Sequence, residues 1–389
     1  MIIRKAVVNS LSDALKLVRS VGCSFNINGF LAKKGLLNAI VIEEIDNRAA
    51  NILKQEAISV GADSAVNEVV SKFKHGSSDA ILFATVDQIE KLINKLSLQP
   101  FGLKEVALKL ANVINEKKVF KYGDKYFDLS KPVVMGIVNM DPNSFSGDGL
   151  TDPDKALKQA IEFEEFGAKI IDIGAESSKP GSKLIDAETE IKRLLPALRK
   201  IKKNVRIPVS VDTYKYETAK AALDEGADVV NDVFALRKGK DKLAKLIADA
   251  KVGLILMHMK GIPKNMQMSP SYKNCTSEVY KFLKERKEYA VSFGVVEERI
   301  AVDPGPGFGK NVEHNIELVK NISIFSTLGA VVGAVSRKRF IKLLTGDEDK
   351  TAFIIANFLT AFYGADIIRV HDVKKTVNVL KIAEIFQRV

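Results

Sequence analysis

From Val133 to the C-terminus, apolar and polar positions repeat in one order. Each repeat is a short apolar run of β-strand character that stops at polar or charged residues and then enters a stretch with apolar residues at helical spacing. The apolar runs are Val133–Val138, Lys169–Ile173, Ile207–Val211, Val229–Asn231, Leu254–Met257, Ile300–Val302, Val331–Val335 and Ile367–Val370. Strands that alternate with helices favour a parallel sheet, so these repeats predict a (β/α)8 TIM barrel over residues 132–389.

The residues before these repeats predict a small α/β N-terminal domain, over residues 1–116. It contains two runs typical of buried strands and three stretches typical of helices, which are Ala39–Ile42, Ala80–Thr85, Arg48–Ser59, Val86–Leu96 and Leu103–Asn115. Residues 117–131 predict a connector with a β-hairpin that turns at Gly123 and Asp124 and could close the bottom of the barrel. No motif in the N-terminal domain indicates its role.

Composition narrows the class of protein. The net charge is +11, but the lysines follow helical stretches, alternate with acidic residues and lack interleaved aromatics, which indicates a solvated surface and no nucleic-acid partner. No apolar run approaches the about 20 residues of a membrane-spanning helix, and the first residues lack the pattern of a signal peptide. We therefore expect a cytoplasmic protein with no membrane partner. Cys23 and Cys275 are too isolated to predict a disulfide or a zinc site.

Polar residues end or follow every predicted strand, which is where a TIM barrel places its catalytic groups. They are Asn139, residues 176–180, Asp212, Asn231 with Asp232, His258, Asp303, residues 336–338, and Arg369 with His371. Alone, any one of these side chains is as compatible with a turn or a structural salt bridge as with a site. Their arrival in strand order predicts an enzyme.

The first clusters suit an anionic substrate. The amide oxygen of Asn139 can complete the shell of a Mg²⁺ ion that also binds substrate phosphate, although a lone Asn is more often a turn residue. The segment DIGAESSKPG from Asp172 carries Ser178 and Lys179, which could meet an anion. Within it, Glu176 is as compatible with bracing the loop as with reacting.

The later clusters suit a flat heterocycle and a second anion. Asp212 and Asn231 offer a carboxylate and an amide on adjacent strands, and the segment DPGPGFGK from Asp303 offers close backbone approach and the ring of Phe308. Residues 336–338, Ser-Arg-Lys, lie at a predicted helix start, where free N–H groups attract anions. Arg369 and His371 point to one face because alternate strand residues do.

Together these motifs resemble those of the dihydropteroate synthases, the folate-pathway members of the pterin-binding barrel family. The matching stretches are MGIVNMDPNSFSGDG from Met135, DIGAESSKPG from Asp172, SVDTYKYETAKAALDEGADVVNDV from Ser210, LMHMKGIPKNMQ from Leu256, DPGPGFGK from Asp303, SRKRFI from Ser336 and RVHDV from Arg369. They span the barrel in the order of the family. The N-terminal region resembles the extension of its longer members.

The resemblance implies a reaction in which 6-hydroxymethyl-7,8-dihydropterin diphosphate loses diphosphate to 4-aminobenzoate, giving 7,8-dihydropteroate. It implies Mg²⁺ at Asn139, competition by sulfonamides, and pairing into homodimers. The catalytic residues that it implies are Asp212, Asp303, Lys338, Arg369 and His371. The further substrate contacts that it implies are Asn231, Ser178, Lys179, Pro180, Met257, Gly307, Phe308, Ser336 and Arg337.

Several positions depart from the family pattern. Asp141-Pro142-Asn143 stands where Thr-Pro-Asp is usual, and Lys179 replaces Arg, which keeps the charge but not the bidentate fork. These departures leave a derivative of 4-aminobenzoate open as the acceptor. Two alternatives also stay open, namely a methyltransferase that passes a methyl group from a tetrahydropterin to a corrinoid protein, and a non-catalytic pterin-binding protein.

Overall fold

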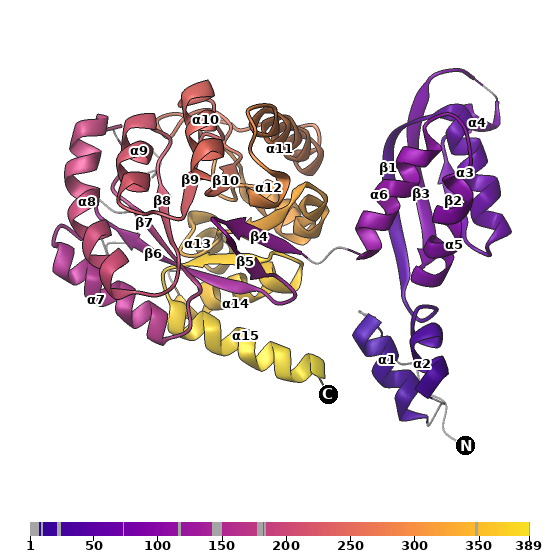
Figure 1. The fold of residues 1–389 in the computed structure, drawn as a ribbon, viewed down its shortest axis with the longest axis horizontal. Coiled ribbons are helices and arrows are strands. Elements are labelled where there is room, and N and C mark those ends of the chain that lie inside the picture. Colours follow the sequence, from indigo (N-terminus) through magenta and orange to yellow (C-terminus); the bar gives the residue numbers. More distant parts are fainter. Residues whose placement is uncertain are drawn as a thin grey trace. The chain divides into compact units, whose positions relative to one another are not determined.

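The chain forms two compact units that divide between Glu116 and Lys117. This computed structural model describes residues 8, 11–21, 25–72, 74–115, 118–141, 150–176, 182, 184–346 and 349–388. Figure 1 shows the elements of both units. None of the described helices is both long and apolar enough to cross a membrane.

The N-terminal unit is an α/β fold around an antiparallel sheet with the strand order β1-β3-β2. Its elements are α1 (Leu11–Ser20), α2 (Phe25–Ala32), β1 (Leu37–Asp46), α3 (Asn47–Ser59), β2 (Asp63–Val66), α4 (Glu68–Ser71), β3 (Ser77–Thr85), α5 (Val86–Leu96) and α6 (Leu103–Asn115). Thr85 and Gln88 form a capping box that starts α5 where β3 ends. The helices α3, α5 and α6 bury Leu53, Leu92 and Leu110 in one core with Leu82 of β3.

One prediction for this unit needs correction, and one of its strands was missed. The strands predicted as buried are open on one face, since Val41 of β1 is 60% exposed and Phe83 of β3 is 39% exposed. The burial of β3 alternates along its length, which indicates that the helices cover only the other face of the sheet. The strand β2 was not predicted, because four residues are too few to show an alternating pattern.

The second unit is a closed barrel of eight parallel strands, with neighbours in the order β10-β11-β12-β13-β6-β7-β8-β9, and it confirms the predicted (β/α)8 fold. Its elements are β4 (Val119–Tyr122), β5 (Lys125–Asp128), β6 (Val133–Asn139), α7 (Pro153–Glu165), β7 (Ile170–Gly174), α8 (Ala187–Asn204), β8 (Val209–Asp212), α9 (Tyr216–Asp224), β9 (Val229–Asp232), α10 (Lys240–Ala250), β10 (Gly253–Met257), α11 (Cys275–Ser292), η1 (Glu297–Arg299), β11 (Ile300–Asp303), α12 (Val312–Lys320), η2 (Ile322–Leu328), β12 (Ala330–Gly333), α13 (Arg339–Thr345), α14 (Lys350–Phe362), β13 (Ile367–Val370) and α15 (Val373–Arg388).

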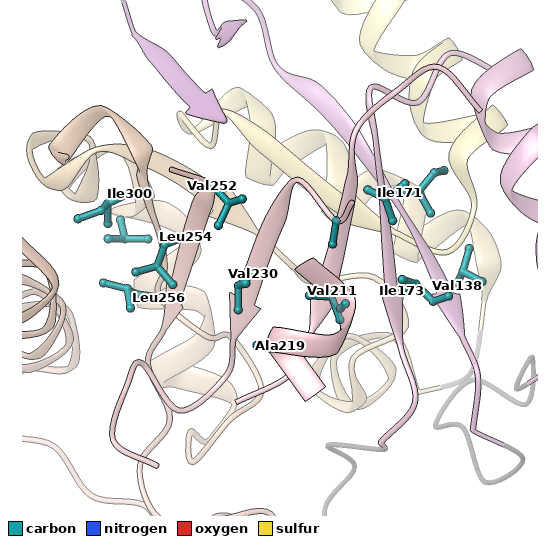
Figure 2. Packing of buried hydrophobic residues seen from close by; sticks show 14 of the residues in the cluster. Val138, Ile171, Ile173, Val211, Ala219, Val230, Val252, Leu254, Leu256 and Ile300 are labelled. Atoms are coloured by element: carbon teal, nitrogen blue, oxygen red, sulfur yellow. The ribbon is translucent and has the colours of Figure 1, made fainter. Parts of the chain in front are cut away.

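The outward-facing strand residues form the main core with the surrounding helices. Figure 2 shows Ile171 and Ile173 of β7, Val230 of β9, and Leu254 and Leu256 of β10 in this layer. Successive strand residues point to opposite faces, so the residues between them face the barrel interior. The free thiol of Cys275 is buried at the start of α11, whereas Cys23 lies outside the described residues.

The predicted hairpin forms and closes the N-terminal end of the barrel. Its strands β4 and β5 pair antiparallel around Gly123, which adopts a positive φ of 53°. Phe120 and Phe127 join an apolar cluster with the lowest inward-facing strand residues, including Ile170 and Ile367. The bottom of the barrel is therefore filled by side chains, and a ligand can enter only from the opposite end.

Phe120 tests this closure. We expect Phe120→Ala to lower the free energy of unfolding by about 3–5 kcal/mol, the usual cost of removing a buried Phe side chain, because Phe120 is fully buried. Urea unfolding followed by circular dichroism measures the change. Tyr126→Ala on the same hairpin is the control, since Tyr126 is 61% exposed. Equal losses in the two variants would contradict a packed barrel floor.

Candidate active site

A cavity of about 290 Å³ opens at the C-terminal ends of the barrel strands. The predicted site residues that line it are Asn139, Asp212, Gly307, Phe308, Ser336, Lys338, Arg369 and His371. Asn231, Met257 and Asp303 do not line its wall, and each is at most 5% exposed. Arg337 also lies outside the wall, in the turn before α13. Ser178, Lys179 and Pro180 lie outside the described residues.

The barrel interior has an apolar layer below and a polar layer above it. Strand alternation sets these layers, because residues two apart along a strand face the same side. The pairs of lower and upper residues are Ile170 and Asp172, Val229 and Asn231, Ala301 and Asp303, and Ile367 and Arg369. The lower residues pack with the hairpin, so the upper residues form the floor of the open end.

Arg369 joins this polar layer across three strands. Its Nε donates to Asp172 Oδ2 at 2.6 Å, and its Nη2 donates to Asp212 Oδ2 at 2.7 Å. Asn231 Nδ2 donates to the same Asp172 oxygen at 3.2 Å. Asp172 Oδ1 is buried and has no hydrogen-bond partner in the described part of the chain. A buried carboxylate oxygen without a donor is ready to accept one from a ligand.

The electrostatic environment of the cavity shifts several pKa values. Burial raises the pKa of Asp212 to about 7, although the Arg369 guanidinium opposes this shift. Burial also raises the pKa of Asp303. Burial would lower the pKa of Arg369, but the carboxylates of Asp172 and Asp212 outweigh it and raise that pKa. Burial and the charge of Arg369 lower the pKa of Lys338 to about 8.

The segment DPGPGFGK folds as a tight loop after β11. Asp303 Oδ1 accepts from the backbone N of Gly305 at 2.7 Å. Gly305 has a φ of +65°, and a Cβ there would lie 2.0 Å from the backbone oxygen of His258, so only glycine fits. Phe308 faces Lys338, whose Nζ lies 4.0 Å from the centre of the Phe ring. The loop thus presents an aromatic face and a cation to the same cavity.

The residues after β12 and β13 meet on one side of the cavity. His371 Nδ1 and Ser336 Oγ are 3.1 Å apart, and the backbone N of His371 also donates to this hydroxyl. The strand β12 ends at Gly333, two residues earlier than predicted, and α13 begins at Arg339. Lys338 is the N-cap residue of α13 and makes no side-chain cap hydrogen bond.

Glu176 braces its loop and also lines the cavity. Its Oε2 accepts from Lys215 Nζ at 2.6 Å and from the backbone N of Ile185 at 2.9 Å. Lys215 also donates to Glu190 Oε2 at 3.0 Å. Asp232, by contrast, faces away from the cavity, and its carboxylate accepts from two backbone N–H groups of the loop after β9. Both acids support loops.

Comparison with known proteins identifies the family. Residues 135–371 match the family described as pterin binding enzymes. The chain belongs to this family. The match covers seven of the eight barrel strands completely and all but the start of β6.

The relatives of this pterin-binding chain are dihydropteroate synthases. A bifunctional dihydropteroate synthase/dihydropteroate reductase of Helicobacter pylori is 34% identical over 98% of each chain. The dihydropteroate synthase of Neisseria meningitidis is 37% identical over 68% of this chain and 96% of its own. The structure of the Xanthomonas albilineans synthase with 4-aminobenzoic acid has a TM-score of 0.64 at 35% identity, and covers 70% of this chain and all of its own. The Yersinia pestis synthase with a sulfonamide drug has a TM-score of 0.66 at 33% identity, with the same coverage.

Asp172 of the polar floor is one residue that the sequence prediction missed. Asp172 begins the segment DIGAESSKPG, but no role was predicted for its side chain. Its signal was a carboxylate in a strand whose five residues are all buried. A buried carboxylate needs a partner, and here the partners are Arg369 and Asn231. Lys310 and His258, which hold the glycine loop, were also given no role.

The donor set near Asn139 fits a sparsely held Mg²⁺ ion. Asn139 and Asp141 line the cavity and carry oxygen ligands of the kind that Mg²⁺ prefers, and Asp141 Oδ1 also accepts from Arg193 at 3.3 Å. The described residues contain no cluster of three or more His, Cys, Asp or Glu side chains that could hold a metal ion. Such a donor set suits an ion that keeps its waters and is bound mainly through substrate phosphate.

Lys338 gives this family member an expected pH dependence. Its amine is charged below a pKa of about 8 and neutral above it, so the attraction for an anionic substrate weakens as the pH rises. We expect kcat/KM for the pterin substrate to fall up to tenfold per pH unit above about pH 8. The Lys338→Arg variant stays charged in this pH range. Whatever the size of its kcat/KM, the profile of this variant should lack the fall above about pH 8, the alkaline limb. An unchanged limb in that variant would assign it to another group.

Proposed function

We propose that the cavity is the active site of a dihydropteroate synthase, a transferase of folate biosynthesis. The reaction joins 6-hydroxymethyl-7,8-dihydropterin diphosphate to 4-aminobenzoate and releases diphosphate. The observation that carries this proposal is the polar floor of Asp172, Asn231, Asp303 and Arg369 beneath a cavity lined by cations. A related structure supports it. The Xanthomonas albilineans synthase in complex with 7,8-dihydropteroate is 33% identical to this chain, with a TM-score of 0.60.

The pterin half of the substrate is assigned to the floor. A pterin ring has N–H donors along one edge, and the carboxylates of Asp212 and Asp303 and the amide of Asn231 can accept from and orient such an edge. The unpartnered Oδ1 of Asp172 adds a further acceptor. Lys338, stacked on Phe308, supplies a cation at the side of the ring. Asp303 lies beneath the cavity wall, so the pterin ring can contact it only after side chains of the wall move. We therefore expect these side chains to change conformation when the pterin binds.

The diphosphate half is assigned to the cations of the cavity wall, one of which, Arg369, also belongs to the floor. In the reaction, the C–O bond to diphosphate breaks, and negative charge develops on the leaving group. Arg369 and His371 line the cavity, and Lys179 is proposed to join them. Fixed cations stabilise charge where it develops, which lowers the barrier to cleavage. Mg²⁺ bound at Asn139 would supply further positive charge to the diphosphate.

The second substrate is assigned to the region of Ser336. Its hydroxyl, the turn at Arg337 and the first N–H groups of α13 suit the carboxylate of 4-aminobenzoate. Phe308 offers a ring face for its aromatic ring. Ser178 and Pro180, outside the described residues, remain proposed contacts of this substrate. The aniline nitrogen forms the new C–N bond to the pterin methylene and then loses one proton. The electron-rich dihydropterin ring delocalises positive charge at that methylene, so attack by the amine needs little base assistance.

A second activity is favoured by the length of the match to the Helicobacter pylori protein. That protein is named as a synthase and a dihydropteroate reductase, and it aligns with 98% of this chain, including the N-terminal unit. The barrel-only Xanthomonas structure covers 70% of this chain. We propose that the N-terminal unit serves a reductase step, in which an added hydride donor and a proton reduce dihydropteroate to tetrahydropteroate.

The cytoplasmic location and the homodimer remain predictions.

The synthase proposal is tested by measuring diphosphate release from the pterin diphosphate with Mg²⁺, with and without 4-aminobenzoate. We expect release that depends on 4-aminobenzoate, with one dihydropteroate formed per diphosphate. Adding reduced nicotinamide or reduced flavin then tests the reductase step through the appearance of tetrahydropteroate. Pterin binding without a condensed product would overturn the synthase and favour a binding protein or the methyltransferase.

Asp303 tests the assignment of the floor. Asp303→Asn keeps the size of the side chain but loses a charged acceptor, so we expect kcat/KM for the pterin substrate to fall about 10- to 150-fold, the equivalent of about 1.5–3 kcal/mol. Asp224→Asn is the control, because Asp224 is an exposed residue paired with Lys220 on α9. Urea unfolding of both variants checks the fold. A fully active Asp303→Asn enzyme would remove Asp303 from the site.

A further inference from the structure

A buried lysine holds the glycine loop of the active site from within. Lys310 is only 3% exposed. Its Nζ lies 2.8 Å from His258 Nδ1, 2.9 Å from the backbone oxygen of Gly305 and 3.1 Å from that of Phe308. An ammonium group has three N–H donors, and these three atoms can accept all of them. No ion pair of Lys310 is found among the described residues, and burial lowers the pKa of its amine to about 7, although the charge of Asp303 opposes this shift.

His258 is neutral in this arrangement and shares a hydrogen bond with Lys310. When the ammonium form of Lys310 donates, the ring proton lies on Nε2, and when the amine is neutral, Nδ1–H can donate to it. Burial and the nearby charge of Lys310 lower the pKa of His258 well below its usual value, which favours the neutral ring. The ring packs edge-on against Phe282, with the centroids 4.8 Å apart. The backbone N of His258 donates to the backbone oxygen of Asp303 at 2.9 Å, which extends the pairing of β10 with β11.

The loop that Lys310 holds carries groups of the proposed site. Gly305, Gly307 and Gly309 all have positive φ, so the loop has no regular structure to fix it. The backbone oxygen of Phe308 accepts from Lys310 Nζ, and the Phe308 ring lies beneath the Nζ of Lys338. Gly307 lies against the same Lys338 side chain, because a Cβ there would be 3.2 Å from its Cδ.

Stability alone does not account for a lysine at this position. Burying an ammonium group costs several kcal/mol unless it is well paired, and an apolar side chain of similar length avoids that cost. Other residues of the cavity wall also anchor the loop, since Asn315 Oδ1 accepts from the N of Gly307 at 2.6 Å and Gln267 donates to the Gly307 oxygen. Lys310 adds contacts to the two neighbouring residues, Gly305 and Phe308.

We propose that Lys310 and His258 are a positioning pair, which fixes Phe308 and Lys338 in the arrangement that receives the pterin ring. The pair acts through these two residues and not on the reacting atoms. The proposal rests on the proposed pterin site. It follows that breaking the contact weakens pterin binding even where the protein stays folded, because substrate binding must then also order the loop.

Matched substitutions at His258 test the pair. Asparagine places an acceptor near the position of Nδ1, whereas leucine has a similar size and no acceptor. We expect His258→Asn to keep KM for the pterin diphosphate within about threefold of the wild type, and His258→Leu to raise it at least tenfold. Lys310→Met should raise it to the same extent. Lys220→Met, which changes an exposed lysine, is the control and should leave KM unchanged.

A double variant and a binding measurement complete the test. Because both residues serve one contact, Lys310→Met with His258→Leu should be no worse than either change alone. The dissociation constant of 6-hydroxymethyl-7,8-dihydropterin, measured by calorimetry on each folded variant, should follow the same order. This readout needs no turnover, so it stands even if the wild type makes no dihydropteroate and the synthase proposal fails. Variants that lower only the Tm and leave KM and pterin affinity unchanged would overturn the pair.

Discussion

The site depends on one partly buried guanidinium that is paired with two carboxylates. Arg369 lies among the barrel strands and forks between Asp172 and Asp212, so it joins β13 to β7 and β8. Charges in a region of low dielectric are costly unless they are paired, and removing one partner leaves the others uncompensated. Asn231, Asp172, Arg369 and Asp212 consequently act as one unit. The same pairing keeps carboxylates at the end of the barrel where a pterin needs acceptors.

This polar unit is possible because the other end of the barrel is closed. The hairpin of β4 and β5 covers the lowest inward-facing residues and fills the interior with Phe120 and Phe127. The apolar layer excludes water below the polar layer, which strengthens every electrostatic interaction above it. The raised pKa of Asp303 and the lowered pKa of Lys338 have the same physical origin, because both groups lose hydration by burial. The barrel therefore sets the charge states of its own site.

Two lysines stabilise the loops around the cavity in different ways. Lys215 bridges the carboxylates of Glu176 and Glu190, so a network of ion pairs braces the loop after β7. Among the described residues, Lys310 bonds to two backbone carbonyl oxygens and an imidazole ring, and it holds the loop after β11. Neither lysine belongs to the polar floor. Their positions explain how irregular loops can present fixed groups to a substrate without help from strand pairing.

The sequence by itself determined the eight strands, the surrounding helices, the hairpin and the edge at which polar residues gather. These features follow from local periodicity, which is encoded within a few residues. The tertiary structure alone decided which polar residues meet. Asp172 and Arg369 are 197 positions apart and become partners only when the barrel closes. It also placed Asp303 beneath the cavity wall, left one face of β1 open, and gave Glu176 and Lys310 supporting roles, because each of these outcomes depends on packing between distant segments.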